Sequence, residues 1–478
     1  MIPVHSKGDC VVMNYENMSA CEKREAIELL GIIVAAVMLL YLLISFYFTS
    51  HLFFSTTING ADVSLKNERQ ADQSIRRYTE NYKLLLIERE GKSDEITGLE
   101  AGLEYKNKTY VKEALHEQKA LRWIGSLFKK QKFLSENLFS YNGNKLNLTL
   151  NQLNCFTQAK IEPENVSYQY TNGHYQMVKE IYGNRVEKEK LKASVADSLL
   201  KGKTKLDLEA NSCYINPVYT MKSSKAFKTL RHLNKYASTH VTYLFGSNRE
   251  VIDGNVIQFW ITVDENLDII LDKDKVRAYV KAMSKKYDTV GVKRSFKTSL
   301  GTMVDIEGGI YGWKIDQEAE TSALADNINS GRIVIREPEY VQRAISRDGN
   351  EIGETYVELN ITRQHMWFYK DGKLIAQGPV VTGNPNRGNS TVTGAYMLNY
   401  KQEGVSLTGP GYEAGVQYWM PFYGNIGIHD AKWRHAFGGE IYKRNGSHGC
   451  VNAPYYLAKA IYEYIESGIP IICYEEKK

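Results

Sequence analysis

A single cysteine stands among residues suited to nucleophilic catalysis. Cys450 is part of the run Ser-His-Gly-Cys-Val-Asn, which occupies positions 447–452. The thiolate is the reactive form of a cysteine, so a catalytic Cys450 needs a base that takes its proton or an electrostatic field that favours ionisation. A neutral imidazole is the natural base near pH 7, and histidines lie within this run and upstream of it.

Two histidines compete for the role of that base. His448 is two residues from Cys450, and this close spacing limits how its ring can be oriented toward the sulfur. His429 ends a strand-like run, residues 426–428, so an adjacent strand can bring it face to face with Cys450. We therefore expect His429 to be the base. Its ring is oriented either by Asp430 or by a backbone carbonyl, and the sequence leaves these alternatives open.

The backbone around Gly449 is suited to stabilising an oxyanion. Glycine allows the chain to approach a bound carbonyl group closely, and the amides of residues 448–450 can then point at the charge that develops on its oxygen. Each such donor lowers a barrier by about 3 kcal/mol. We expect this part of the site to be formed and supported by His448, Gly449, Ser447 and Asn452.

Two other interpretations of Cys450 compete with a catalytic thiol. A cysteine is also compatible with the role of a small buried hydrophobe, although the polar neighbours of Cys450 argue against it. A zinc site would use His429, His435, His448 and Cys450. This segment has neither CxxC nor HxxxH spacing, and His448 and Cys450 are awkward co-ligands. We expect neither a metal nor another cofactor.

An aromatic-rich run from Tyr412 to Tyr423 precedes His429. It is consistent with a lid or substrate wall formed by Tyr412, Tyr418 and Trp419, because loops over a rigid scaffold often carry binding residues. It is equally consistent with an ordinary β-core.

The N-terminal region contains an apolar segment long enough to cross a membrane. Leu29 to Phe48 has no charged residue, and about 20 apolar residues form a transmembrane helix. Lys23 and Arg24 precede it, whereas the next basic residue downstream is Lys66. This asymmetry predicts a cytoplasmic tail (1–28), one transmembrane helix (29–50) and the bulk of the chain outside the cell. The length argues against a core helix, and the lack of a small-x-small cleavage site argues against a signal peptide.

Composition restricts the remaining classes of function. The chain has 478 residues, of which 43% are hydrophobic and 24% charged, which indicates several folded domains. A net charge of +5 without a clustered basic face gives no reason to expect nucleic acid as a partner. Four extracytoplasmic cysteines are too few for a disulfide framework. A bridge between Cys155 and Cys213 is chemically compatible with an oxidising compartment, and spacing alone does not establish it.

The periodicity of apolar residues predicts three domains after the apolar segment. We expect α+β domains over 51–222 and 223–340, and a mostly-β, β-sandwich-like domain over 351–475. The chain is therefore predicted to be an α+β multidomain protein. The individual elements expected are helix pairs over 111–138, a strand over 355–368, a hairpin turn at Asp371-Gly372, a helix from about Pro454 to Glu466 and a closing strand over 469–474.

The segment from His429 to Asn452 resembles the signature of the L,D-transpeptidase family with a YkuD-like catalytic domain. That signature is a histidine, an intervening segment and then Ser/Thr-His-Gly-Cys-hydrophobic-Asn; residues 430–446 form the intervening segment here, and the resemblance covers Tyr356 to Tyr474. The family's Thr-Pro-Thr-Gly loop is matched by residues 391–394, with Val392 in place of proline. Residues from about 58 to 340 resemble paired peptidoglycan-binding domains, on the stretches 286–291, 296–298 and 311–314.

The resemblance implies a bacterial cell-wall enzyme. Cys450 would attack the bond between the L-centre and D-Ala of a donor tetrapeptide stem, release D-Ala and form a thioester, and an amine of a second stem would then form a 3→3 cross-link. His429 would move the proton, and carbapenems would acylate the cysteine. The implied partners are peptidoglycan stem peptides and the cell membrane, and the implied roles are cell wall biogenesis and cell shape. An L,D-carboxypeptidase and an inactive wall-binding protein are the alternatives.

Overall fold

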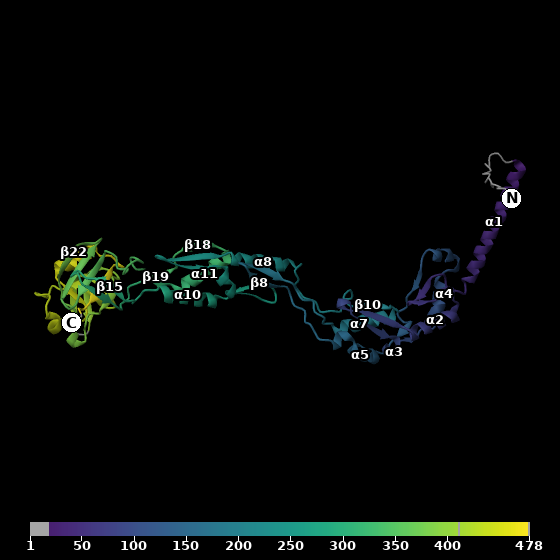
Figure 1. Cartoon of the computed structure of the whole chain (residues 1–478), viewed down its shortest axis with the longest axis horizontal. Helices are drawn as coiled ribbons and strands as arrows, with labels where there is room; N and C mark the ends of the chain where they lie inside the picture. Colours follow the sequence, from purple (N-terminus) through teal and green to yellow (C-terminus); the bar gives the residue numbers. More distant parts are fainter. Residues whose placement is uncertain (1–18, 410–411, 477–478) are drawn as a thin grey trace, which may run out of the picture. The chain divides into compact units, whose positions relative to one another are not determined.

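The computed structural model describes residues 19–409 and 412–476, and it divides into two compact units. The first comprises Met1–Val166 and Lys179–Thr220, and the second comprises Ser167–Val178 and Met221–Lys478. Residues 1–18 of the predicted cytoplasmic tail lie outside the described residues. Helices and sheets are mixed in both units, an apolar helix stands near the N-terminus, and the C-terminal domain is rich in sheet (Figure 1). The predicted fold class is confirmed.

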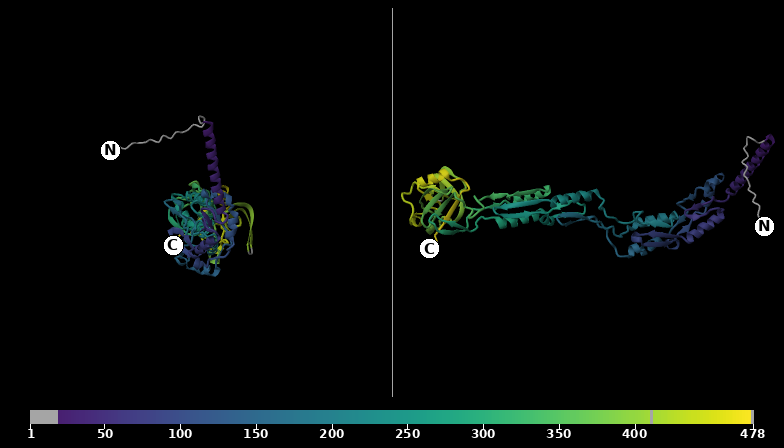
Figure 2. Two further views of the ribbon diagram at one scale, coloured as in Figure 1. Left: turned by 90° about the vertical axis from the view of Figure 1, so that its right-hand side faces the viewer. Right: turned by 45° about the horizontal axis from the view of Figure 1, so that its top comes forward.

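Helix α1 (Ala20–Tyr47) projects from the first unit as a single straight helix (Figure 2). Residues Lys23–Tyr47 are long and apolar enough to cross a membrane, and few of them are buried by the rest of the chain. Such a helix near the N-terminus fits either a membrane span or a signal sequence. Only its C-terminal end is packed, since Ser45 and the following Phe48 are buried.

The rest of the first unit is built from short strands and helices around one apolar core. The sheets are β2-β1-β6, β10-β3-β4 and β5-β7. The core receives Ile75 from α2, Leu84 from β3 and Val195 from α7, all fully buried. In chain order the elements after α1 are β1 (Thr56–Ile58), β2 (Ala61–Asp62), α2 (Glu68–Glu80), β3 (Lys83–Ile87), η2 (Arg89–Gly91), β4 (Ser93–Thr97), α3 (Gly98–Ala101), β5 (Glu104–Tyr105), α4 (Tyr110–Glu117), η3 (Ala120–Leu127), β6 (Gln131–Phe133), β7 (Phe139–Ser140), α5 (Gly143–Gln152), α6 (Asn154–Thr157), α7 (Lys188–Leu200) and β10 (Lys205–Asp207).

One prediction for this unit is wrong, and one question that the sequence leaves open is answered. Residues 111–138 are not helix pairs but α4, the 3₁₀ helix η3 and strand β6. Lys119 interrupts the helical pattern because its φ of 48° is left-handed, which ends α4. Cys155 and Cys213 are both buried free thiols, so no disulfide joins them.

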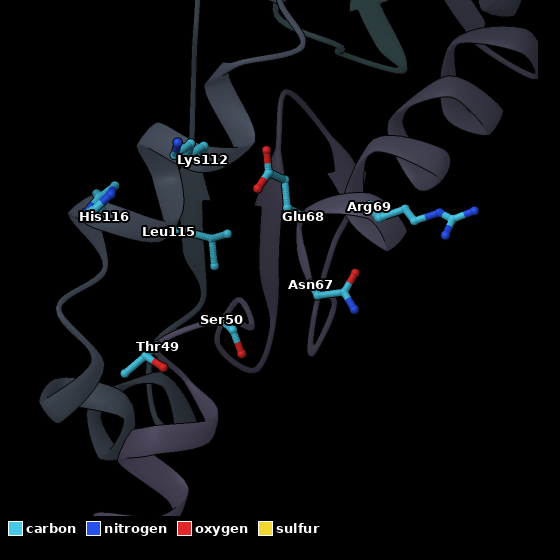
Figure 3. A pocket seen from close by; sticks show the side chains of 8 residues that line it. All are labelled: Thr49, Ser50, Asn67, Glu68, Arg69, Lys112, Leu115 and His116. Carbon is cyan, nitrogen blue, oxygen red and sulfur yellow. The ribbon is translucent and has the colours of Figure 1, made fainter.

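A pocket of about 440 Å³ is lined by the turn that follows α1, the start of α2 and helix α4 (Figure 3). Thr49 and Ser50 follow α1, Arg69 lies in the first turn of α2, and Lys112 and His116 come from α4. Asn67 caps α2 by accepting a hydrogen bond from the amide of Gln70.

The second unit begins with a sheet of order β12-β11-β18, which packs against α8, α10 and α11. The hairpin β8–β9 joins it, since Tyr175 is bonded to Asn234 of α8 and buried in the same core. In chain order the elements are β8 (Ser167–Thr171), β9 (His174–Val178), α8 (Ser224–Ala237), β11 (His240–Phe245), β12 (Asn248–Ile252), α9 (Gly254–Ile257), η4 (Gln258–Trp260), β13 (Ile261–Val263), β14 (Ile269–Leu271), α10 (Lys273–Tyr287), β15 (Arg294–Lys297), β16 (Met303–Ile306), β17 (Lys314–Ile315), α11 (Gln317–Ser330), β18 (Ile333–Arg336) and β19 (Tyr340–Gln342).

This part of the second unit shares a core with the C-terminal domain. Phe296 and Trp313 are buried in one cluster with Ile472 and Tyr474. Fully buried Glu358 of the C-terminal domain accepts hydrogen bonds from the amide and hydroxyl of Ser299 and from the hydroxyl of Tyr474. These contacts hold the two parts together through packing and buried polar groups.

The C-terminal domain consists of two sheets and a helix between them. The sheet orders are β22-β21-β20-β28-β23 and β24-β25-β26-β27, and fully buried Leu457 and Ile461 of α13 lie in the shared core. The elements are β20 (Tyr356–Asn360), β21 (His365–Lys370), β22 (Lys373–Pro379), η5 (Pro385–Arg387), β23 (Gly394–Met397), β24 (Gln402–Gly409), β25 (Tyr412–Tyr423), β26 (Ile426–Asp430), α12 (Ile441–Asn445), β27 (Val451–Ala453), α13 (Tyr455–Tyr464) and β28 (Pro470–Tyr474).

The predicted strand over 355–368 is wrong, because it is two antiparallel strands, β20 and β21. Gln364 adopts a φ of 50° between them, and its side-chain amide donates to the carbonyl of Ile361 and the hydroxyl of Thr382. These bonds satisfy a tight turn that an alternating apolar pattern does not reveal. The hairpin turn at Asp371-Gly372, the late helix and the closing strand are confirmed.

Candidate active site

Parallel pairing of β26 with β27 brings the predicted site residues together. His429 is the register partner of Asn452, and Ile428 is the partner of Val451. Cys450 directly precedes β27, so its backbone adjoins the strand that carries Asn452. The His429 ring points toward Asn452, to which it is bonded.

A chain of hydrogen bonds defines the protonation of the His429 ring. Nε of Arg434, which can only donate, bonds to Oδ1 of Asn452 at 2.7 Å. The Asn452 Nδ2 group therefore faces Nε2 of His429, at 2.9 Å, and donates to it. The other ring nitrogen, Nδ1, lies 2.8 Å from the backbone carbonyl oxygen of Asp430, which can only accept. The ring is thus neutral, with its proton on Nδ1 and its lone pair on Nε2.

Burial favours the same protonation state. His429 is 3% exposed, and desolvation lowers the pKa of its imidazole below the ordinary value, with the nearby charge of Arg434 acting in the same direction. The backbone carbonyl and charge of Asp430 oppose this pKa shift without reversing it. A buried neutral imidazole with an available lone pair has the properties of a general base.

The Asp430 carboxylate does not orient the ring. Its Oδ1 accepts hydrogen bonds from the amides of Gln417 and Tyr418 in β25, each at 2.8 Å. Of the two alternatives that the sequence leaves open, the backbone carbonyl of Asp430 is the group that contacts the ring. The Asp430 side chain binds the neighbouring strand β25 instead.

The thiol of Cys450 is half-buried and lies over the start of β26. It donates to the carbonyl oxygen of Asn425 at 3.4 Å, and among the described residues it forms no hydrogen bond with the His429 ring. Burial raises the pKa of the thiol, and the N–H of Gly427, which points at the sulfur, partly offsets this. The free chain therefore holds Cys450 as a protonated thiol.

Ser447 shapes the loop that carries the thiol. Its hydroxyl accepts from the amide of Gly449 at 3.1 Å and donates to the carbonyl of Cys450 at 2.5 Å. Gly449 adopts a φ of 125°, which glycine tolerates best. Because the Gly449 amide is used inside the loop, it is not a donor for a bound oxyanion in this conformation. The His448 side chain is exposed.

The loop of residues 391–394 contacts the loop that carries Cys450. The hydroxyl of Thr391 accepts from the amide of Gly383 at 2.9 Å and donates to the carbonyl of Gly449 at 2.7 Å. Gly383 packs closely there, since a Cβ at this position would lie 2.9 Å from the Cα of Gly449. Residues 391–394 therefore hold the nucleophile loop through Thr391, and the substitution of proline by Val392 leaves that contact intact.

The aromatic residues of β25 divide between the two faces of the strand. Trp419 pairs with His429 across the strands, with ring centroids 5.9 Å apart. Tyr418, the next residue, is buried in the core beside Tyr455 and Tyr462. Tyr412 begins the strand, and its side chain lies outside the described residues. Trp419 therefore adjoins the site, whereas Tyr418 belongs to the β-core.

Two residues near the ring were not singled out by the sequence. Trp433 lies 5.9 Å from His429 on ring centroids and is 47% exposed, and Arg434 orients Asn452. Both belong to the polar and aromatic loop that follows His429, and that composition was the available signal. No group of three or more His, Cys, Asp or Glu side chains able to hold a metal ion occurs within the described ranges.

The site thus combines a cysteine and a neutral histidine in a sheet-rich domain, and sequence comparisons place it in a family. Residues 354–473 match the model of the L,D-transpeptidase catalytic domain, YkuD. Residues 95–207 and 219–336 match the model of the peptidoglycan binding domain family PG_binding_4. No curated protein matches the chain.

Solved structures include similar proteins from Enterococcus faecium. A mutant of its L,D-transpeptidase is 33% identical, covers 52% of this chain and is itself covered completely, with a TM-score of 0.44. The catalytic domain of the same organism's L,D-transpeptidase, acylated by ertapenem, is 38% identical over 26% of this chain and 98% of that domain, with a TM-score of 0.24. The chain belongs to the L,D-transpeptidase family, and the predicted resemblance is confirmed.

Proposed function

We propose that the chain is a peptidoglycan L,D-transpeptidase that forms 3→3 cross-links through a thioester on Cys450. The observation that carries the proposal is the neutral His429 ring, whose Nε2 lone pair is set by Asn452 on the strand that follows Cys450. A protonated, half-buried thiol needs such a base.

Acylation begins when the thiol leaves the carbonyl of Asn425 and replaces Asn452 as the partner of Nε2. His429 takes the thiol proton while the sulfur forms a bond to the carbonyl carbon of the L-centre–D-Ala peptide bond. The carbonyl oxygen gains the negative charge. The tetrahedral intermediate collapses, its C–N bond breaks, and the protonated His429 gives its proton to the D-Ala amine, which leaves.

Transfer reverses these steps with a new amine. The side-chain amine of a second stem attacks the thioester carbonyl, His429 takes the proton that this nitrogen loses, and the sulfur leaves and is reprotonated. The Trp419 and Trp433 rings beside His429 restrict water there, and exclusion of water favours the amine over hydrolysis.

The apolar helix α1 supports anchoring in the cell membrane. The basic residues Lys23 and Arg24 precede its apolar part, and this asymmetry favours a cytoplasmic N-terminus with the catalytic domain facing the wall. The two regions matched by the peptidoglycan binding model support peptidoglycan as the partner of the upstream domains as well.

The test incubates the full-length chain in detergent with disaccharide-tetrapeptide and analyses the products by mass spectrometry. We expect loss of D-Ala, a cross-linked dimer and, with a carbapenem, one covalent adduct. The Cys450→Ala variant should show none of these. An adduct on Cys450→Ala removes this residue from the nucleophile role. Tripeptide without dimer identifies an L,D-carboxypeptidase instead, and wall binding without turnover in either protein identifies an inactive binding protein.

A further inference from the structure

Exposed apolar side chains gather in a short segment that the proposed catalysis does not use. Residues 119–132, here called the η3 segment, contain η3 and the start of β6. Phe128 is 87% exposed, and Leu121, Ile124 and Leu127 are exposed as well. Soluble surfaces expose large apolar residues singly, whereas a contiguous group marks an interaction site.

The η3 segment lies along the apolar part of α1. The hydroxyl of Tyr41 donates to the carbonyl of Leu121 at 2.5 Å, and the rings of Tyr41 and Trp123 lie 5.9 Å apart. Trp123 and Ile124 line an apolar pocket of about 320 Å³ together with Val37, Met38, Leu40, Tyr41 and Ile44 of α1.

This contact fixes the depth of the segment relative to the helix. Tyr41 lies six residues before Tyr47, the last residue of α1, which corresponds to about 9 Å along a helix axis. Amphipathic segments at a membrane surface bury their apolar face about 5–10 Å into the boundary between headgroups and acyl chains. If α1 spans a bilayer, the η3 segment reaches that boundary.

The polypeptide holds the η3 segment in this position from both sides. Just before it, the side-chain Nε2 group of Gln118 donates to the backbone carbonyls of Phe48 and His51, directly after α1. At its end, β6 pairs in parallel with β1, which follows α1 closely in the sequence. The segment is therefore fixed to the base of the helix.

The charges of the segment suit an anionic surface. It contains five basic residues and no acidic ones: Lys119, Arg122, Lys129, Lys130 and Lys132. All five are exposed, and none of them forms a salt bridge within residues 19–409 and 412–476. Basic side chains beside apolar ones are the pattern of segments that bind anionic lipid headgroups.

We propose that the η3 segment docks on the anionic outer leaflet of the membrane that α1 spans. Leu121, Ile124 and Phe128 enter the boundary between headgroups and acyl chains, and the lysines contact lipid phosphates. This rests on the proposed anchoring through α1. Its consequence is a second attachment point, which limits how freely the first unit can tilt on its helix.

The test uses the full-length chain in vesicles of phosphatidylglycerol mixed with phosphatidylcholine, in which the acyl chains are brominated near the headgroup. Bromine quenches tryptophan fluorescence on contact. We expect quenching of the wild type, its loss in Trp123→Phe, and no change of quenching in Trp433→Phe, the matched control in the catalytic domain. The double variant with Trp123→Phe and Phe128→Trp moves the tryptophan to position 128, the most exposed apolar position of the segment. This variant should regain quenching.

Each outcome is decisive. Equal quenching in the wild type and Trp123→Phe, with none regained by the Phe128→Trp combination, overturns the docking. Equal quenching in pure phosphatidylcholine overturns the role of the lysines. Retention of the chain in membranes washed with alkaline carbonate is measured in parallel. Loss of retention refutes anchoring by α1, whereas retention without quenching refutes only the docking of the η3 segment.

Discussion

Replacing Asn452 by Asp changes the protonation of His429 while keeping the shape of the side chain. In the wild type, Asn452 Nδ2 donates to Nε2 of His429 at 2.9 Å, because Arg434 occupies Oδ1 at 2.7 Å. An aspartate cannot donate there when ionised. Its second oxygen would accept a hydrogen bond from a protonated Nε2, which stabilises the imidazolium.

The expected shift follows from the charge that is added. A carboxylate within about 4–6 Å of an ionisable group shifts its pKa by about 1–3 units. The lower half of that range applies, because the new carboxylate also pairs with Arg434. We therefore expect the pKa of His429, which is lowered in the wild type, to rise by about one to two units. Below the new pKa, the fraction of neutral base falls about tenfold per pH unit.

The assay is the rate of Cys450 acylation by a carbapenem, measured by intact mass between pH 5 and 9. The acidic limb of the Asn452→Asp profile should move upward by one to two units, with rates that approach those of the wild type at high pH. Asn452→Ala is the control, since it removes the hydrogen bond to Nε2 without adding charge and should move the acidic limb upward far less than Asn452→Asp does. An unmoved acidic limb in Asn452→Asp would refute the assignment of His429 as the base.

Three further predictions concern the thiol, its supporting loop and the junction within the second unit. Burial lowers the pKa of His429, so the acidic limb of wild-type acylation should lie below about pH 6.5. Burial raises the pKa of Cys450, so the rate of its alkylation by iodoacetamide should still be rising above about pH 8.5. Thr391→Val removes the hydroxyl bonded to Gly449 and should cost about 1–3 kcal/mol of unfolding free energy, with Thr391→Ser close to the wild type by chemical denaturation. Burial raises the pKa of Glu358, so the folded state binds its proton more tightly. Stability should therefore fall as pH rises from about 4.3 to that raised pKa, and Glu358→Gln should abolish this slope in thermal melts followed at each pH.

Sequence patterns predicted the helices, strands and turns that depend only on residues within one short segment. The apolar stretch of α1, the turn at Asp371-Gly372 and the stripe of α13 each depend on spacing within one segment, and the structure contains them. The pattern failed at Lys119 and Gln364, where a left-handed residue interrupts a regular periodicity. The interruption at Gln364 is stabilised by Thr382, a partner distant in the sequence, which periodicity does not show.

The same distinction between local patterns and distant partners applies to the candidate active site. The types of Cys450 and His429 indicate chemistry, and strand-like residues around them suggest that they meet. The hydrogen bond from Arg434 to Asn452, which fixes the tautomer, depends on a loop that returns to β27. The carboxylate of Asp430 was assigned as one of two orienting groups, and only the register of β25 shows that it binds that strand instead.

The core shared by the second upstream domain and the catalytic domain has a consequence for unfolding. Phe296 and Trp313 on one side and Ile472 and Tyr474 on the other bury each other, so neither part keeps its packing when the other melts. Glu358 would also lose its partner Ser299. The two should therefore denature in one calorimetric transition, and a mechanical pull on the upstream domain would be transmitted to the sheet beside Cys450 rather than absorbed by a slack linker.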